Sequence, residues 1–148
     1  MRLARRDRAR GSVLVEFTLS ATFLVALFLG VWQFGYGFYI YSELEQAVRD
    51  GARYASLLTY NSSNSTPTAG FTTAVQNVVV YGNAAGGTTP VAPGLTTADV
   101  SVTVTFTSVP TAITVAITNY RLPTYFGNQT LNGKPTTTFP FVGVYGPP

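Results

Sequence analysis

The chain has 148 residues, enough for one modest domain, and only 10% of them are charged, against about a quarter in typical globular proteins. The net charge of +3 arises in the first ten residues, where five arginines stand against one aspartate, so the rest of the chain offers no basic surface for nucleic acid. Cysteine and histidine are absent, and Asp99 is the only acidic residue after Asp50. We therefore expect no disulfide, no catalytic residues, no metal site and no cofactor.

A long apolar stretch follows the basic segment of residues 1–11. No charged residue occurs between Glu16 and Glu43, and this interval exceeds the roughly 20 apolar residues that cross a bilayer. Four aromatic residues gather toward its far end, where amphipathic rings favour the membrane interface: Trp32, Tyr36, Tyr39 and Tyr41. The pattern predicts a membrane helix over residues 12–42. The competing interpretation is a buried core helix of a soluble protein.

The charges on either side of this stretch predict its orientation. Arginines crowd the N-terminal side, whereas Glu43 and Glu45 open the C-terminal flank. The positive-inside rule then places the basic segment in the cytoplasm and the remainder of the chain across the membrane.

The helix is expected to continue beyond the membrane as an amphipathic segment over residues 43–59. Its apolar positions recur at spacings of three and four residues, which is one helical face: Leu44, Val48, Ala52, Ala55 and Leu58. We therefore expect one helix from about Ser12 to Thr59, whose later part packs against the C-terminal domain.

Residues 60–148 are expected to form a small β-rich domain. The segment 71–81 has helical spacing and is interpreted as a short helix, with a strand as the alternative. Strict alternation predicts strands at 99–106 and 112–118, joined by a linker that contains Pro110.

The end of the chain carries weaker patterns. Residues 121–135 are expected to be a loop. Residues 136–145 are a plausible last strand, which Pro140 would confine to a sheet edge or a bulge. The predicted fold class is α+β: one long N-terminal helix packed on a small antiparallel sheet.

One short constellation carries chemistry at the start of the apolar stretch. Gly11 is followed by Ser12, and Glu16 and Phe17 precede the uncharged run. A carboxylate at the edge of a bilayer segment is costly to bury and needs a partner. Cleavage after Gly11 would turn Ser12 into a new N-terminus, whose amino group would lie one helical turn from Glu16 or beside the Glu16 of a neighbouring subunit.

The Gly-xxxx-Glu-Phe pattern is similar to the processing site of type IV prepilins. A second segment, from Phe34-Gly35 to the Gly-Ala-Arg-Tyr-Ala sequence at 51–55, resembles TadE-like (type IVc, Tad) pilins and pseudopilins. The resemblance implies a pilin-like fold, cleavage by a prepilin peptidase between Gly11 and Ser12, and an assembly role for Glu16 and Phe17.

The same resemblance implies the partners and the location. They are the lipid bilayer before assembly, a membrane assembly platform, and copies of this chain or sister pilins in an extracellular filament. The departures are Ser12 in place of the methylated Phe of many type IV pilins and a domain larger than that of most major Tad pilins. The chain would thus be a minor pseudopilin or an unusual major subunit.

Three functions remain open on the sequence. The first is a cleaved filament subunit, and the second is an uncleaved signal-anchored envelope protein whose outer domain binds a partner. The third is a secreted soluble protein, although the apolar run is longer than the 7–15 residues of an ordinary signal peptide.

Overall fold

The computed structural model describes residues 3–124 and 129–147, with side chains from Gly11 onward, so Met1, Arg2 and the side chains of the basic segment lie outside the described part. The chain divides into two compact units, Met1–Tyr36 and Gly37–Pro148. The helix α1 (Leu3–Leu57) forms the described residues of the first unit and opens the second.

Helix α1 begins earlier than predicted, at Leu3 rather than near Ser12, and ends at Leu57, close to the expected Thr59. The early start follows from composition, because alanine, leucine and arginine are among the best helix formers. No proline precedes Pro67, so nothing interrupts the helix over its 55 residues.

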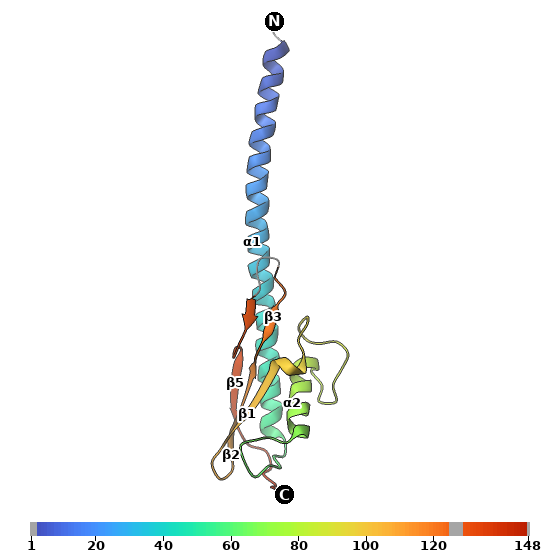
Figure 1. Ribbon diagram of the computed structural model, residues 1–148, viewed down its shortest axis with the longest axis vertical. Helices are drawn as coiled ribbons and strands as arrows, with labels where there is room; N and C mark the ends of the chain where they lie inside the picture. The colour runs from blue at the N-terminus through green and yellow to red at the C-terminus, as the bar shows by residue number, and fades with distance from the viewer. Residues whose placement is uncertain (1–2, 125–128, 148) are drawn as a thin grey trace. The chain divides into compact units, whose positions relative to one another are not determined.

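The second unit contains one further α-helix, a short 3₁₀ helix and five strands among its described residues. They are α2 (Ala69–Tyr81), η1 (Thr97–Asp99), β1 (Val100–Phe106), β2 (Pro110–Ile117), β3 (Tyr120–Leu122), β4 (Gln129–Leu131) and β5 (Thr136–Pro140). Strands β1, β2 and β5 form an antiparallel sheet with β2 in the middle, and β3 pairs with β4 separately (Figure 1). The predicted α+β class, a long helix packed on a small antiparallel sheet, is confirmed.

Most of the predicted elements of this unit are confirmed. The segment 71–81 is helical, and Gly82 ends α2 in the left-handed conformation at φ 70°. The last strand lies at a sheet edge and ends at Pro140, as proline requires. Pro110 is the first residue of β2 rather than part of the linker, a position where proline costs no ladder bond.

The expectation that residues 121–135 form only a loop was wrong. Strands β3 and β4 lie in and next to this segment, and Tyr120 pairs with Leu131 while Arg121 pairs with Thr130. Each strand has three residues, too few to show an alternating pattern in the sequence. Residues 125–128, which the loop prediction also included, lie outside the described residues.

The later part of α1 packs into the second unit through the face that the sequence predicted. Leu44, Val48, Ala52 and Ala55 are fully buried there. Gly51 lies on the adjoining side, where a Cβ atom would collide with Cγ2 of Val79 on α2. The two helices therefore approach closely because residue 51 has no side chain.

The sheet has an apolar inner face and a hydroxyl-rich outer face. The inward side chains of β2 are fully buried: Ile113, Val115 and Ile117. On the outer face, Thr114 pairs with Thr103 of β1 and with Thr138 of β5, and the hydroxyls of Thr114 and Thr138 lie 2.7 Å apart. These cross-strand pairs keep the outer face compatible with water.

The end of α1 is closed by the C-terminal segment of residues 141–146. The amide of Val142 donates to the carbonyl of Ser56 at 3.0 Å, and the amide of Tyr60 donates to the carbonyl of Val144 at 2.8 Å. Gly143 lies directly against the helix end, because a Cβ there would collide with the carbonyl oxygen of Leu58. The segment thus satisfies a carbonyl that the helix end leaves open.

An aromatic cluster joins these parts. The ring of Tyr60 lies with its centroid 5.5–6.5 Å from four others: Phe71, Phe106, Phe141 and Tyr145. The Tyr60 hydroxyl donates to the carbonyl of Asn64 at 2.6 Å. Because these rings come from α2, β1 and the C-terminal segment, the cluster holds the unit together at one end.

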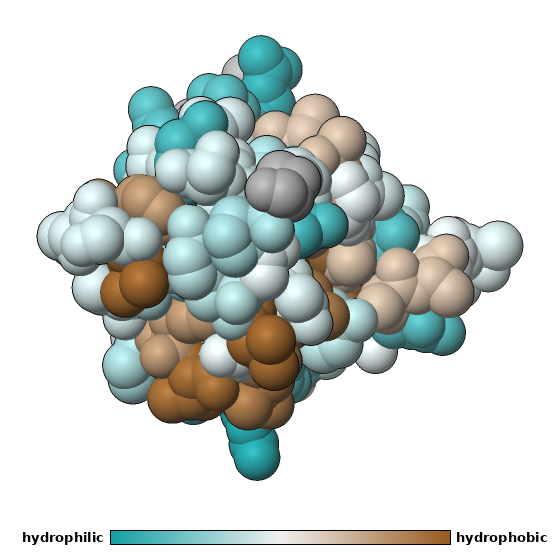
Figure 2. Space-filling view, turned by 90° about the horizontal axis from the view of Figure 1, so that it is seen from below, coloured by the Kyte–Doolittle hydropathy of each residue, from teal (hydrophilic) through white to brown (hydrophobic). Residues whose placement is uncertain are grey.

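The surface of the second unit is largely polar. Figure 2 shows one end of it, where hydrophilic and intermediate side chains cover much of the face and apolar ones gather toward one side. The exposed large apolar side chains of this unit include Leu57, Val109, Val142 and Val144.

Candidate functional site: the processing junction and the apolar helix

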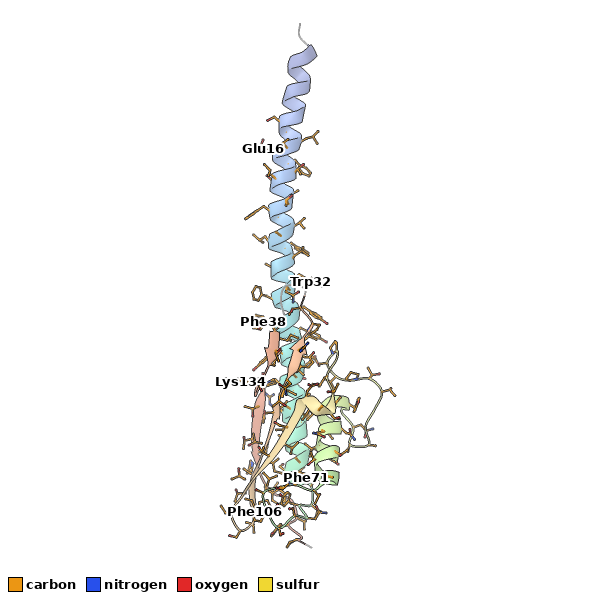
Figure 3. The ribbon with its side chains drawn as sticks, viewed as in Figure 1. Glu16, Trp32, Phe38, Phe71, Phe106 and Lys134 are labelled. Carbon is orange, nitrogen blue, oxygen red and sulfur yellow. The ribbon has the colours of Figure 1, made fainter. Side chains whose placement is uncertain are left out.

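The first unit is a helix with apolar side chains exposed all around it. From Val13 to Phe34, the large apolar residues are between 45% and 74% exposed, and their side chains project from every side of the ribbon (Figure 3). A helix that is apolar all around is suited to a membrane or to a protein core, not to water. The helix over Gly11–Leu57 is long and apolar enough to cross a bilayer.

The four predicted site residues lie together at the start of this apolar region. Gly11, Ser12, Glu16 and Phe17 are all exposed on α1, and Phe17 is 70% exposed. Ser12 and Glu16 are four residues apart, so they lie one turn from each other on the same helical face. The Gly11–Ser12 bond is in regular helix, and nothing lies within 4 Å of the place where a Cβ on Gly11 would be.

Glu16 is the charged group of this region, and it makes no ion pair within the described residues. Its polar neighbours differ in this respect. The hydroxyl of Thr18 donates to the carbonyl of Leu14 at 2.8 Å, and that of Thr22 donates to the carbonyl of Thr18 at 2.8 Å. The threonines therefore satisfy themselves within the helix, whereas a Glu16 carboxylate in an apolar environment needs a partner from elsewhere.

The aromatic residues predicted at the membrane interface differ in exposure. Trp32 and Tyr39 are exposed, while Tyr36 and Tyr41 are partly covered. Ile40 is the first fully buried side chain of the second unit, so the change from exposed to buried apolar residues falls within this aromatic stretch.

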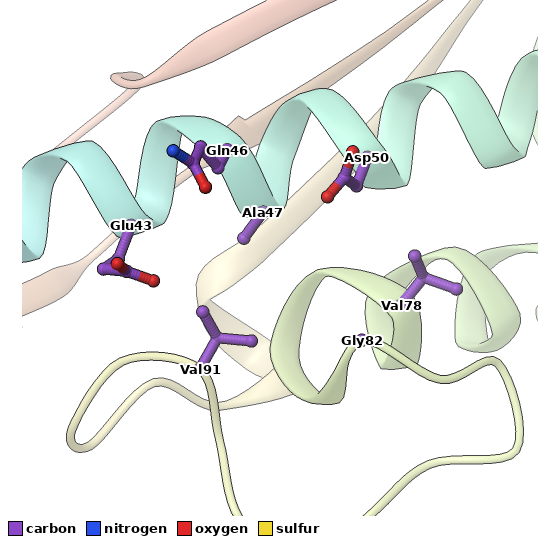
Figure 4. A pocket seen from close by; sticks show the side chains of 7 residues that line it. All are labelled: Glu43, Gln46, Ala47, Asp50, Val78, Gly82 and Val91. Atoms are coloured by element: carbon purple, nitrogen blue, oxygen red, sulfur yellow. The ribbon is translucent and has the colours of Figure 1, made fainter.

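The structure also contains a cleft that sequence reasoning missed. It has a volume of about 310 Å³ and lies between α1, the end of α2 and the following loop (Figure 4). Its lining residues are Glu43, Gln46, Ala47, Asp50, Val78, Gly82 and Val91. The seven-residue spacing of Glu43 and Asp50 could have indicated a shared helical face, but the loop that completes the cleft has no sequence signature.

Within the part of the chain that the structure describes, no group of three His, Cys, Asp or Glu residues could hold a metal ion. The geometry supplies instead an apolar helix and one carboxylate that lacks a partner. Residues 11–53 match the family model of TadE-like proteins. The matched segment runs from Gly11 through the apolar helix to Arg53, and it includes Ser12, Glu16 and Phe17.

The TadE-like domain confirms the family resemblance inferred from the sequence. It associates the chain with Tad pili, whose TadE-like proteins are typically not enzymes. The hydrophobic N-terminal helix of this domain indicates a membrane or envelope location. No curated protein and no solved structure gave a significant match. The β-sheet of the second unit lies outside the matched residues.

Proposed function

We propose that this TadE-like chain is a structural subunit of a type IV-like (Tad) filament. A prepilin peptidase would cleave between Gly11 and Ser12, and a membrane assembly platform would then polymerise the mature chain through its N-terminal helix. In this proposal residues 1–11 are the leader, 12–42 cross the membrane and later form the filament core, 43–59 are amphipathic, and 60–148 are the outer domain.

The observation that carries the proposal is the exposed apolar helix with Glu16 one turn after Ser12. The apolar surface is stable in a bilayer, and packing against the same helix of other copies, or of sister pilins, would bury it equally well outside the cell. Cleavage after Gly11 creates an α-amino cation at Ser12. Pairing this cation with Glu16, in the same or a neighbouring copy, would neutralise both charges in the apolar bundle.

The test is the intact mass and N-terminal sequence of the protein in a sheared surface fraction, for the wild type and for Gly11→Ala. We expect the wild type to begin at Ser12 and the variant to remain full-length in the membrane fraction. The matched control is Gly30→Ala, because a Cβ at Gly30 also meets nothing within 4 Å, yet that site is far from the junction. We expect this control to be processed normally.

A full-length wild type that stays in the membrane and is indifferent to Gly11→Ala would contradict the proposal. The chain would then be a signal-anchored envelope protein whose outer domain binds a partner. A soluble, secreted wild type cleaved at another site would contradict both of these functions.

A further inference from the structure

The cleft beside α1 contains two carboxylates and no cation. Glu43 and Asp50 are seven residues apart on α1, so they lie on one face about 10 Å apart along the helix. Neither forms an ion pair within the described residues, where the ion pair found on α1 joins Glu45 and Arg49 at 2.8 Å. The C-terminal end of α2 closes the cleft at Gly82, and the carbonyl end of a helix adds partial negative charge (Figure 4). The cleft therefore favours a cation.

Two exposed cations of the same unit lack a carboxylate partner among the described residues. Arg121 is on β3, exposed while its neighbour Tyr120 is buried, and Lys134 lies between β4 and β5. The acidic residue nearest to them in the sequence, Asp99, already accepts hydrogen bonds from the amide and the hydroxyl of Thr96 at 2.9 and 2.6 Å. We call Arg121 and Lys134 the basic edge.

The basic edge cannot reach the cleft of its own copy. In Figure 3 Lys134 lies beside β5, on one side of α1, whereas α2 and the loop that follows it lie on the other side. Both surfaces belong to the unit Gly37–Pro148, so this separation is internal to one compact body. A cation that fills the cleft must therefore come from another molecule.

We propose that the basic edge of a second copy docks into the cleft between α1 and α2. The inference rests on the proposed filament function and deepens it by naming a contact between outer domains. Because the two surfaces lie on opposite sides, a two-fold dimer cannot satisfy both. A head-to-tail contact satisfies both and leaves one cleft and one basic edge free at the ends, so it repeats without closing. The charges would set the register of neighbouring copies.

The first test is cross-linking of intact filaments of the full chain. The sequence has no cysteine, so introduced ones are the only thiols. We would combine Gln46→Cys in the cleft with Asn132→Cys, an exposed position two residues before Lys134, and add a short bis-maleimide. The expected product is a ladder of multimers. The control pairs Asn132→Cys with Arg53→Cys, an exposed α1 position outside the cleft, and should remain monomeric.

The second test exchanges the charges. Reversing the basic edge (Arg121→Glu with Lys134→Glu) should lower the sheared filament fraction about tenfold, because like charges would then meet in the contact. Adding Glu43→Lys and Asp50→Lys should restore assembly. The control Arg53→Glu should assemble normally, and the membrane-bound precursor of every variant should reach wild-type levels.

Products that stop at dimers, products that link the chain to a different protein, or no products at all would overturn the docking proposal. Normal assembly of the charge-reversed chain would overturn it as well. If the wild type is processed at Gly11 and sheared from the surface while the ladder is missing, only the docking contact is wrong. If the wild type is neither processed nor sheared, the filament function fails and the contact fails with it.

Discussion

Gly51 shows how a single residue controls the contact between two helices. Glycine weakens a helix interior by about 1 kcal/mol relative to alanine, so its presence within α1 needs a reason. The reason is Val79, whose Cγ2 occupies the space that a Cβ at residue 51 would need. Val79 is itself fully buried, and a β-branched side chain has little rotamer freedom with which to move away.

We therefore expect Gly51→Ala to lower the free energy of unfolding by about 1–3 kcal/mol, the usual cost of overpacking, despite the better helix propensity of alanine. Chemical denaturation of the full chain in detergent would measure it. Gly37→Ala is the control, because a Cβ there meets nothing within 4 Å, and it should leave stability unchanged or raise it slightly. Adding Val79→Ala should recover part of the loss, and equal stabilities of Gly51→Ala and Gly37→Ala would show that the helices do not touch there.

At the scale of elements, Tyr60 connects the end of α1 with the other layers of the second unit. Its ring contacts Phe71 of α2 and Phe106 of β1, and its amide pairs with the C-terminal segment at Val144. Burial raises the pKa of Tyr60, a hydrogen bond with Ser62 lowers it in part, and the nearby Tyr145 raises it further. The folded unit thus favours the neutral phenol.

This shift predicts a loss of stability at alkaline pH. The unfolded pKa of tyrosine is about 10, so the contribution of Tyr60 is complete below that pH and is lost as the pH rises through the higher folded value. We expect Tyr60→Phe to lose about 1 kcal/mol at neutral pH with its hydrogen bond to Asn64, and then to fall less steeply than the wild type above about pH 10. Unfolding curves at several pH values, with the exposed Tyr39→Phe as control, would measure it. Parallel curves for Tyr60→Phe and the wild type would rule out the role of Tyr60.

At the scale of the whole molecule, two surfaces of different character are joined in one chain. The unit Met1–Tyr36 exposes apolar side chains on a helix, whereas the unit Gly37–Pro148 buries its apolar residues and exposes polar ones. Such a chain needs one apolar environment and one aqueous environment at once. A membrane supplies both, and so would a filament with an apolar core, as we propose for the assembled state.

In that proposal Glu16 acts after processing, so Glu16→Gln should separate the two steps. We expect the variant to be cleaved normally to Ser12 but to reach the sheared fraction at about a tenth of the wild-type level or less, since it leaves the Ser12 amine unpaired in an apolar bundle. N-terminal sequencing and quantitative blotting would measure both steps. The control Glu45→Gln removes an exposed ion pair, which is worth at most about 1 kcal/mol, and should assemble normally. Full assembly of Glu16→Gln would contradict this role for the carboxylate.

Much of the fold was predictable because it depends on local patterns. The uncharged run between Glu16 and Glu43 predicted the apolar helix, and alternation of valines predicted β1. The junction at Gly11 was also visible, since its constellation is contiguous in the chain. The short strands β3 and β4 were missed, because three residues carry no readable period.

The sequence by itself determined the apolar helix, the processing motif and the alternating strands, because each is encoded by residues close together in the chain. Only the tertiary structure decided why residue 51 is glycine, which segment closes the end of α1, and where Glu43 and Asp50 face a cleft. Each of these depends on contacts between residues far apart in the sequence, such as Gly51 with Val79 or Ser56 with Val142. Such contacts follow from side-chain volume and backbone hydrogen bonding in three dimensions, and no local pattern records them.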